Sequence, residues 1–372
     1  MSDYYFKTSD LSVGYNGNAL INDINVELSK GQIMTLIGPN GSGKSTILKS
    51  ISNHLKTIAG TVYIDEKSLS DLSYKDVSTR MAVVLTERPK VELMTCRDVV
   101  ATGRYPYTGR LGILSAEDNE KVDAAIKLVN AEEIAERDFT ATSDGQRQRV
   151  MLARAICQEP EIIILDEPTS FLDIKHKLEL LDILRMMVET KNIVVIMSLH
   201  EIDLAQKASD IIMCVKGDHI SQLGTPRDIF TKESITRLYD LDKGNYNNYF
   251  GSVELPAPVG EPDTFVIAGA GTGIGIFREL QKKKIPFYAG VLHTNDLDYQ
   301  VALDLAAEVV SAQAFENITE EEYKKAEELM KKCSKVIYSG VEFGTTNRAN
   351  KRLLEEAKML GKELPDAERI GR

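Results

Sequence analysis

The stretch that decides the fold reads Gly38-Pro39-Asn40-Gly41-Ser42-Gly43-Lys44-Ser45-Thr46. It follows the apolar run 33–37 and leads into residues 45–54, which have a helical pattern, so the order is strand, glycine-rich loop, helix. Glycines let consecutive backbone N–H groups point into one cavity, where they and the helix N-terminus hold phosphate oxygens. The sequence therefore predicts a phosphate-binding loop in an α/β fold.

Three side chains of this loop have separate expected roles. Lys44 would reach the β- and γ-phosphates of a nucleotide. The Ser45 hydroxyl would bind Mg²⁺, while Thr46 would add a contact to the phosphates.

Two carboxylates follow a second apolar run. Asp166 and Glu167 come directly after residues 162–165, whose β-branched side chains are typical of a buried parallel strand. The first carboxylate could hold Mg²⁺ through water, and the second could orient and deprotonate an attacking water. The alternative is an acidic turn that caps the next element, but the order of the motifs along the chain favours the catalytic interpretation.

Composition limits the class of protein. The chain has 372 residues, of which 43% are hydrophobic and 27% charged, as in ordinary globular proteins. Its formal net charge of −11 argues against a general nucleic-acid binder, which usually has a basic face.

We find no apolar run long enough to span a membrane and no secretion leader. The four cysteines are scattered, which favours buried free thiols in the cytosol.

The pattern along the chain predicts two α/β domains. Residues 1–255 alternate apolar runs with helical stretches and include a mainly helical insert at about 87–158. Three prolines and a glycine crowd the next stretch, which we interpret as a linker over 256–263. Residues 264–372 then alternate short strands with helices, which is typical of a small Rossmann-like α/β domain.

The second domain opens with a glycine-rich loop of its own, Ala268-Gly269-Ala270-Gly271-Thr272-Gly273-Ile274-Gly275. Such a loop could approach a phosphate or another small ligand closely. It departs from a strict dinucleotide-binding pattern, because Ile274 stands where the third glycine belongs. Asp296 lies roughly where a ribose-binding acid would fall. Ligand binding and a tight turn without a ligand both remain open.

Three further positions, Tyr15, Asp173 and His200, bring a resemblance to a known family over roughly the first 255 residues. With the phosphate loop and the two carboxylates, they make the chain resemble an ATP-binding cassette (ABC) ATPase. The resemblance implies that Tyr15 stacks on adenine, although a tyrosine that packs in a turn is the alternative. It also implies that Asp173 communicates across a pair of cassettes and that His200 contacts the γ-phosphate.

The signature segment departs from the family pattern and reads Thr142-Ser143-Asp144-Gly145-Gln146. Ser143, Gly145 and Gln146 can still present a hydroxyl, a backbone N–H and a helix N-terminus to the γ-phosphate of an opposite subunit. Asp144 would either weaken ATP-driven closure by repulsion or point outward and cap the helix.

A second departure lies where the family has a glutamine that contacts Mg²⁺ and the attacking water. The match places Thr86 there, followed by Glu87, and either oxygen could substitute. The resemblance thus implies an ATPase that uses ATP and Mg²⁺. The catalytic residues would be Lys44, Glu167 and His200, and the metal ligands Ser45, Thr86 and Asp166. The nucleotide-binding residues would be Tyr15, Gly38, Asn40, Gly41, Gly43, Lys44, Ser45, Thr46, Ser143, Gly145, Gln146 and Asp173.

Within the family, Gly103-Arg104-Tyr105-Pro106-Tyr107 and Gly109-Arg110-Leu111-Gly112 resemble importers of ferric siderophores, haem and vitamin B12. That resemblance implies paired cassettes, membrane permease subunits, an extracytoplasmic binding protein and a cytoplasmic location at the inner face of the membrane. The second domain would regulate transport or dimerise. The alternatives are a low-turnover regulatory ATP-binding protein and a soluble cassette protein that acts on ribosomes or DNA.

Overall fold

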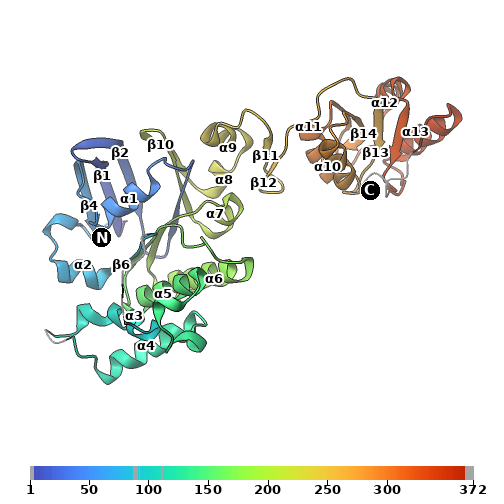
Figure 1. Ribbon diagram of the computed structural model, residues 1–372. Coiled ribbons are helices and arrows are strands. Elements are labelled where there is room, and N and C mark those ends of the chain that lie inside the picture. Colours follow the sequence, from blue (N-terminus) through green and yellow to red (C-terminus); the bar gives the residue numbers. More distant parts are fainter. Residues whose placement is uncertain (1–3, 87–90, 92, 110–111, 365–372) are drawn as a thin grey trace. The chain divides into compact units, whose positions relative to one another are not determined.

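The computed structural model describes residues 4–86, 91, 93–109 and 112–364, which form two compact units (Figure 1). The first unit comprises Met1–Phe230 and the second Thr231–Arg372. Each contains a sheet with parallel strands and flanking helices, which confirms the expected P-loop fold with a second α/β domain. None of the described helices has the length and apolar character needed to cross a bilayer.

Two sheets build the first unit. The antiparallel sheet has the order β2-β1-β4-β5. The second sheet has the order β10-β9-β3-β8-β7-β6 and is parallel except for β10. The strands are β1 (Phe6–Tyr15), β2 (Asn18–Leu28), β3 (Ile33–Ile37), β4 (Ala59–Ile64), β5 (Lys67–Ser68), β6 (Met81–Val84), β7 (Ile162–Leu165), β8 (Val194–Ser198), β9 (Ile211–Lys216) and β10 (His219–Gly224).

The parallel strands are apolar because helices or the other sheet cover both of their faces. Every residue of β3, β7 and β8 is buried. The helices of this unit are α1 (Lys44–Ile51), α2 (Tyr74–Arg80), α3 (Cys96–Ala101), α4 (Ala116–Leu128), α5 (Asp144–Cys157), α6 (Ile174–Lys191), α7 (Ile202–Ala208) and α8 (Pro226–Ile229).

A helical group made of α3, α4 and α5 corresponds to the expected insert, and Figure 1 shows the three together. Each begins with a capping box at Thr95, Ser115 or Ser143, whose hydroxyl accepts from the backbone N–H three residues later. Arg104 ties the group together, because its Nε donates to Asp118 Oδ1 at 2.9 Å in a buried ion pair. The predicted motif residues Arg110 and Leu111 lie outside the described residues.

The second unit has a parallel sheet of order β15-β14-β13-β16 with helices on both faces. Figure 1 shows α10 and α11 on one face and α12 and α13 on the other, and each face has its own apolar core. The elements are α9 (Lys232–Tyr239), β11 (Asn245–Asn247), β12 (Ser252–Glu254), β13 (Thr264–Ile267), α10 (Ile274–Lys282), β14 (Tyr288–His293), α11 (Leu297–Leu305), β15 (Glu308–Ala312), α12 (Glu320–Lys332), β16 (Lys335–Tyr338) and α13 (Arg348–Met359).

Residues 231–255 belong to this second unit, although the sequence pattern grouped them with the first domain. Lys232 Nζ lies 2.8 Å from Asp304 Oδ1, and Glu254 forms an ion pair with Arg278. Such long-range polar contacts have no local sequence signal. The domain limits expected from the sequence, 1–255 and 264–372 with a linker at 256–263, remain predictions.

All four cysteines are free and buried. Burial raises the pKa of the Cys214 thiol to about 12 and that of Cys157 to about 11. Protonated thiols of this kind are poor nucleophiles and poor metal ligands.

Candidate functional site

The phosphate loop joins the end of β3 to the start of α1. Gly38, Gly41 and Gly43 have φ values of 148°, 77° and 96°, which favour glycine. A Cβ on Gly38 would lie 2.1 Å from the carbonyl oxygen of Val215. The glycine spacing is therefore required by a close approach to β9 as well as by the turn.

Lys44 lies at the bottom of this loop and is only 5% exposed. Its Nζ donates to the carbonyl oxygens of Gly38 at 2.9 Å and Pro39 at 3.0 Å. Burial lowers the pKa of the Lys44 ammonium, while the carboxylates of Glu167 and Asp166 act in the opposite direction.

A cavity of about 350 Å³ opens over the loop. It brings together residues from four separate parts of the sequence, so Lys44, Glu167 and His200 share one site. The lining residues are Leu20, Asn40, Gly41, Gly43, Lys44, Ser45, Thr46, Glu167 and His200.

Hydroxyl groups surround the Asp166 carboxylate, which is 3% exposed. Ser45 Oγ donates to Asp166 Oδ1 at 3.1 Å, and Thr86 Oγ1 donates to Oδ2 at 2.8 Å. Ser198 Oγ at the end of β8 donates to Oδ1 at 2.8 Å. Carboxylate and hydroxyl oxygens are the ligands that Mg²⁺ prefers, so this group fits a magnesium ion. Glu87, the other candidate at the glutamine position, lies outside the described residues.

Glu167 is held from three directions. His200 Nε2 lies 2.6 Å from Glu167 Oε1, and Ser170 Oγ donates to Oε2 at 3.2 Å. The backbone N–H of Glu167 donates to Ser198 Oγ at 2.8 Å. The position of the carboxylate at the edge of the phosphate cavity suits a base that orients water.

Ser198 is a site residue that the sequence analysis missed. Its hydroxyl connects Asp166 with the backbone of Glu167. The only sequence signal was a hydroxyl residue at the end of an otherwise apolar strand, two positions before His200.

Tyr15 lies beside the same loop, with its hydroxyl 3.2 Å from Thr46 Oγ1. The Tyr15 side chain is 49% exposed, so its ring has an open face. The position is compatible with a ring that stacks on a base next to the phosphate cavity.

The signature segment forms the start of α5. Ser143 Oγ accepts from the N–H of Gln146 at 3.3 Å, and Gln146 Oε1 accepts from the N–H of Ser143 at 3.0 Å. Asp144 Oδ1 lies 3.2 Å from Arg147 Nη1, and Arg147 Nη2 also donates to the carbonyl of Thr140. Ser143, not Asp144, is the N-cap of α5. Asp144 lies in the first turn, where Arg147 pairs with its charge, and it also lines the cavity over this helix start.

A separate cavity of about 540 Å³ lies over this helix start. Ser143, Gly145 and Gln146 line it together with Asp173. Asp173 caps α6 and accepts from His176 N at 2.9 Å, which lowers the pKa of the Asp173 carboxyl. As lined by described residues, this cavity and the phosphate cavity have no member in common.

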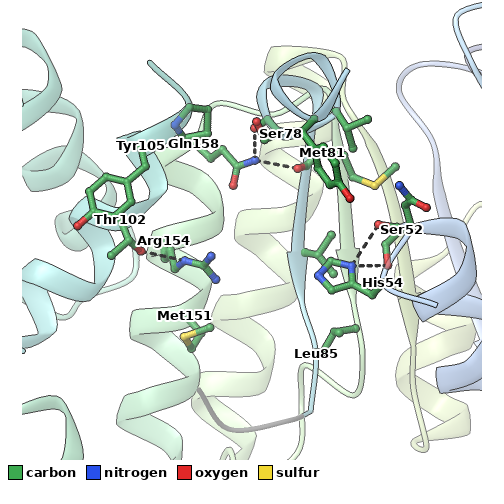
Figure 2. Close-up of a pocket in the computed structure, with 15 residues that line it drawn as sticks. Ser52, His54, Ser78, Met81, Leu85, Thr102, Tyr105, Met151, Arg154 and Gln158 are labelled. Atoms are coloured by element: carbon green, nitrogen blue, oxygen red, sulfur yellow. Dashed lines mark hydrogen bonds between the residues drawn. The ribbon is translucent and has the colours of Figure 1, made fainter. Parts of the chain in front are cut away.

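A third cavity, of about 890 Å³, lies between β6, α2 and the helical group (Figure 2). Figure 2 shows Gln158, whose Nε2 donates to the carbonyl oxygens of Ser78 and Met81, and Arg154, whose Nε donates to Thr102 Oγ1 at 3.0 Å. Burial lowers the pKa of the Arg154 guanidinium. The sequence analysis did not find this cavity, because its lining comes from five separate segments.

The glycine-rich loop of the second unit has a different environment. The N–H of Gly273 donates to both carboxyl oxygens of Asp298, at 2.9 and 3.0 Å. The N–H of Ala270 donates to Asp296 Oδ2 at 2.7 Å. Protein carboxylates thus occupy the donors that a phosphate would use, which favours the tight-turn alternative for this loop.

Comparisons with known proteins point to the same family as the phosphate loop and the carboxylates beside it. A family model described as ABC transporter matches residues 21–170, and one described as the MJ0874 family matches residues 287–366. The chain is 44% identical over 287 residues to the uncharacterized ABC transporter ATP-binding protein MJ0873 of Methanocaldococcus jannaschii, covering 77% of this chain and 99% of that protein. It is 34% identical over 235 residues to the iron(3+)-hydroxamate import ATP-binding protein FhuC of Bacillus subtilis, covering 63% of this chain and 87% of that protein.

One similar solved structure is the dimeric, post-hydrolysis state of the ATP-binding cassette MJ0796 bound to ADP and Pi. Its TM-score is 0.53 at 26% sequence identity, covering 60% of this chain and 99% of that chain.

Proposed function

Because the chain belongs to the ABC transporter ATP-binding proteins and is an ATPase, we propose that it energises an importer of a metal chelate, such as a ferric siderophore, haem or vitamin B12. The observation that carries this proposal is the convergence of Lys44, Ser45, Glu167 and His200 on one cavity over the phosphate loop. The 34% sequence identity to an iron(3+)-hydroxamate import ATP-binding protein supports a metal chelate as the cargo.

In the proposed reaction, Lys44 and the loop N–H groups bind the β- and γ-phosphates of ATP. Ser45, Thr86 and Asp166 would hold Mg²⁺, which would supply positive charge to neutralise the negative charge that develops on the phosphates. Glu167 orients the attacking water and accepts its proton, and His200 holds the Glu167 carboxylate and reaches the γ-phosphate.

We propose that a second cassette completes the site. The signature residues Ser143, Gly145 and Gln146 line a different cavity from Lys44 in the same chain. The helix N-terminus at Ser143 can bind a γ-phosphate that a partner cassette presents. The dimeric ATP-binding cassette among the similar structures supports this arrangement.

We further propose that a permease subunit docks in the cavity between β6 and the helical group (Figure 2). Leu85 lines that cavity, and the next residue, Thr86, donates to the Asp166 carboxylate. A segment that enters this cavity would therefore lie one residue from the magnesium ligands. This short path offers a physical route between transport and hydrolysis, at the inner face of the membrane.

The experiment is affinity purification of the chain from detergent-solubilised native membranes, with identification of bound proteins by mass spectrometry. We expect a permease, and an extracytoplasmic binding protein encoded beside it. Tyr74→Glu, at a 91% exposed residue on the cavity rim, should abolish permease recovery while leaving basal ATP hydrolysis unchanged. Tyr249→Glu, at a 70% exposed residue of the second unit, is the matched control. A chain that hydrolyses ATP freely and never recovers a membrane subunit contradicts the importer proposal.

A further inference from the structure

The second unit has a cavity of about 490 Å³ at the carboxyl ends of its parallel strands. Ala270 follows β13, His293 ends β14, Phe315 follows β15 and Thr346 precedes α13, so the loop after each of the four strands contributes one wall. Ligands of open α/β sheets bind outside the carboxyl ends of the strands, and small-molecule sites have volumes of about 300–1,000 Å³. The place and size of the cavity are those of a ligand site.

Hydrogen bonds hold the four loops in fixed positions. His293 Nε2 lies 2.9 Å from the carbonyl oxygen of Glu316, and the N–H of Ile318 donates to the carbonyl of Thr346 at 3.0 Å. The Ala270 N–H donates to Asp296, which connects the first loop to the second. The rim is therefore organised before any ligand arrives, which reduces the entropy cost of binding.

The charge of the cavity disfavours phosphate-bearing ligands. None of its described lining residues is a lysine or an arginine, and Asp296 places a carboxylate in the wall. The N–H groups of Gly273 and Ala270 already bind Asp298 and Asp296. A phosphate in this cavity would meet the negative charge of Asp296, and like charges at close range repel.

Two apolar side chains and several acceptors define what does fit. Phe315 is 85% exposed and Leu297 is 50% exposed, so both present apolar surface to a ligand. Each Asp296 oxygen accepts one backbone N–H and keeps a further lone pair. A carbonyl only accepts, so His293 Nε2 carries the proton in its bond to Glu316, which leaves Nδ1 as the other ring nitrogen for a ligand.

We propose that this cavity binds a nucleoside-like ligand without phosphate groups. Its planar base stacks on Phe315, and its hydroxyl or amino groups donate to Asp296 and His293. This role makes the second unit a small-molecule sensor attached to the ATPase, independent of the cargo of the importer.

The test uses the full chain carrying Glu167→Gln, saturated with Mg²⁺-ATP so that the first unit cannot take up the probe. Adenosine, guanosine, cytidine, uridine and their 5′-monophosphates are titrated by calorimetry. We expect saturable binding of at least one nucleoside and roughly tenfold weaker binding of its monophosphate, because of repulsion by Asp296. Phe315→Ala should weaken binding by about 5- to 150-fold, the usual contribution of one base stacked on an aromatic ring.

Leu303→Ala is the matched control, because Leu303 is 53% exposed on α11 and does not line the cavity. Phe315 is almost fully exposed, so its replacement should leave folding intact. Three results would overturn the proposal: no nucleoside binds, a monophosphate binds as tightly as its nucleoside, or Phe315→Ala binds like the parent chain.

Discussion

The two glycine-rich loops of the molecule have the same order of elements and opposite surroundings. Each follows a buried parallel strand and leads into a helix, α1 in the first unit and α10 in the second. In the first unit Lys44 lies beneath the loop, and its Nζ donates to the carbonyl oxygen of Gly38. In the second unit the loop N–H groups of Ala270 and Gly273 are bound by Asp296 and Asp298.

The difference lies in where nearby carboxylates find their donors. Asp166 in the first unit accepts hydrogen bonds from the hydroxyls of Ser45, Thr86 and Ser198. These bonds of Asp166 are made with side-chain hydroxyls and not with the N–H groups of the loop. Asp298 in the second unit is fully buried and takes its donors from the loop backbone. A strand-loop-helix pattern therefore predicts a turn, whereas the surrounding charges decide whether that turn binds an anion.

The largest expected effect is on the carboxylate beside the first loop. Glu167→Gln removes the proposed base and should lower ATP hydrolysis about 10³-fold, with ATP binding retained. Phosphate release and equilibrium binding of labelled ATP measure the two quantities. Glu189→Gln on the exposed surface of α6 is the control. A Glu167→Gln chain with near-normal turnover would mean that another group activates the water.

The corresponding change in the second loop should affect stability. Asp298→Ala leaves the buried N–H of Gly273 without an acceptor and should lower the free energy of unfolding of the second unit by about 2 kcal/mol. Urea denaturation measures this change, with Glu328→Gln, at an exposed residue of α12, as the control. An unchanged midpoint for Asp298→Ala would remove the structural role that we assign to this carboxylate.

The same residue has a pH signature. Burial raises the pKa of the Asp298 carboxyl above its unfolded value, so the folded unit binds this proton more tightly than the unfolded chain does. Its contribution to stability is therefore complete at low pH and declines as the pH rises above about 4 and through the folded-state pKa. Asp298→Asn should remove this contribution to the pH dependence of the free energy of unfolding. Urea midpoints measured between pH 4 and 7 test this, and a variant with the same pH dependence as the parent chain would contradict it.

A smaller effect should come from the signature segment. Arg147→Met removes the cation that pairs with Asp144 and should lower ATP hydrolysis roughly tenfold, because the carboxylate then repels the γ-phosphate. Asp144→Gly in the same background should restore most of the rate. If the double variant is as slow as Arg147→Met alone, the loss comes from the helix and not from the charge.

The smallest effect should be at Tyr15. Tyr15→Phe keeps the ring and loses only a 3.2 Å contact with Thr46 at an exposed position, so ATP affinity should change less than twofold. Tyr15→Ala should weaken ATP binding by about fivefold through loss of stacking. Equal affinities for the Phe and Ala variants would exclude a stacking role.

Local spacing was enough to predict the phosphate loop, the carboxylates at Asp166 and Glu167, and the class of both domains. Long-range partners were not predictable, because hydroxyls and ion pairs far apart in sequence carry no periodic signal. Ser198 reaches both Asp166 and the backbone of Glu167 from a different strand. The Asp144 alternatives could be weighed only once Arg147 was found to pair with the carboxylate.

The separation of the phosphate cavity from the signature cavity has a kinetic consequence. If a copy of this chain supplies the opposite half of each site, turnover by the isolated protein requires an encounter between two molecules. The initial rate should then rise with the square of protein concentration when the chain is dilute, and become linear once pairs are saturated. A permease that holds two copies side by side would remove this dependence by raising their effective concentration.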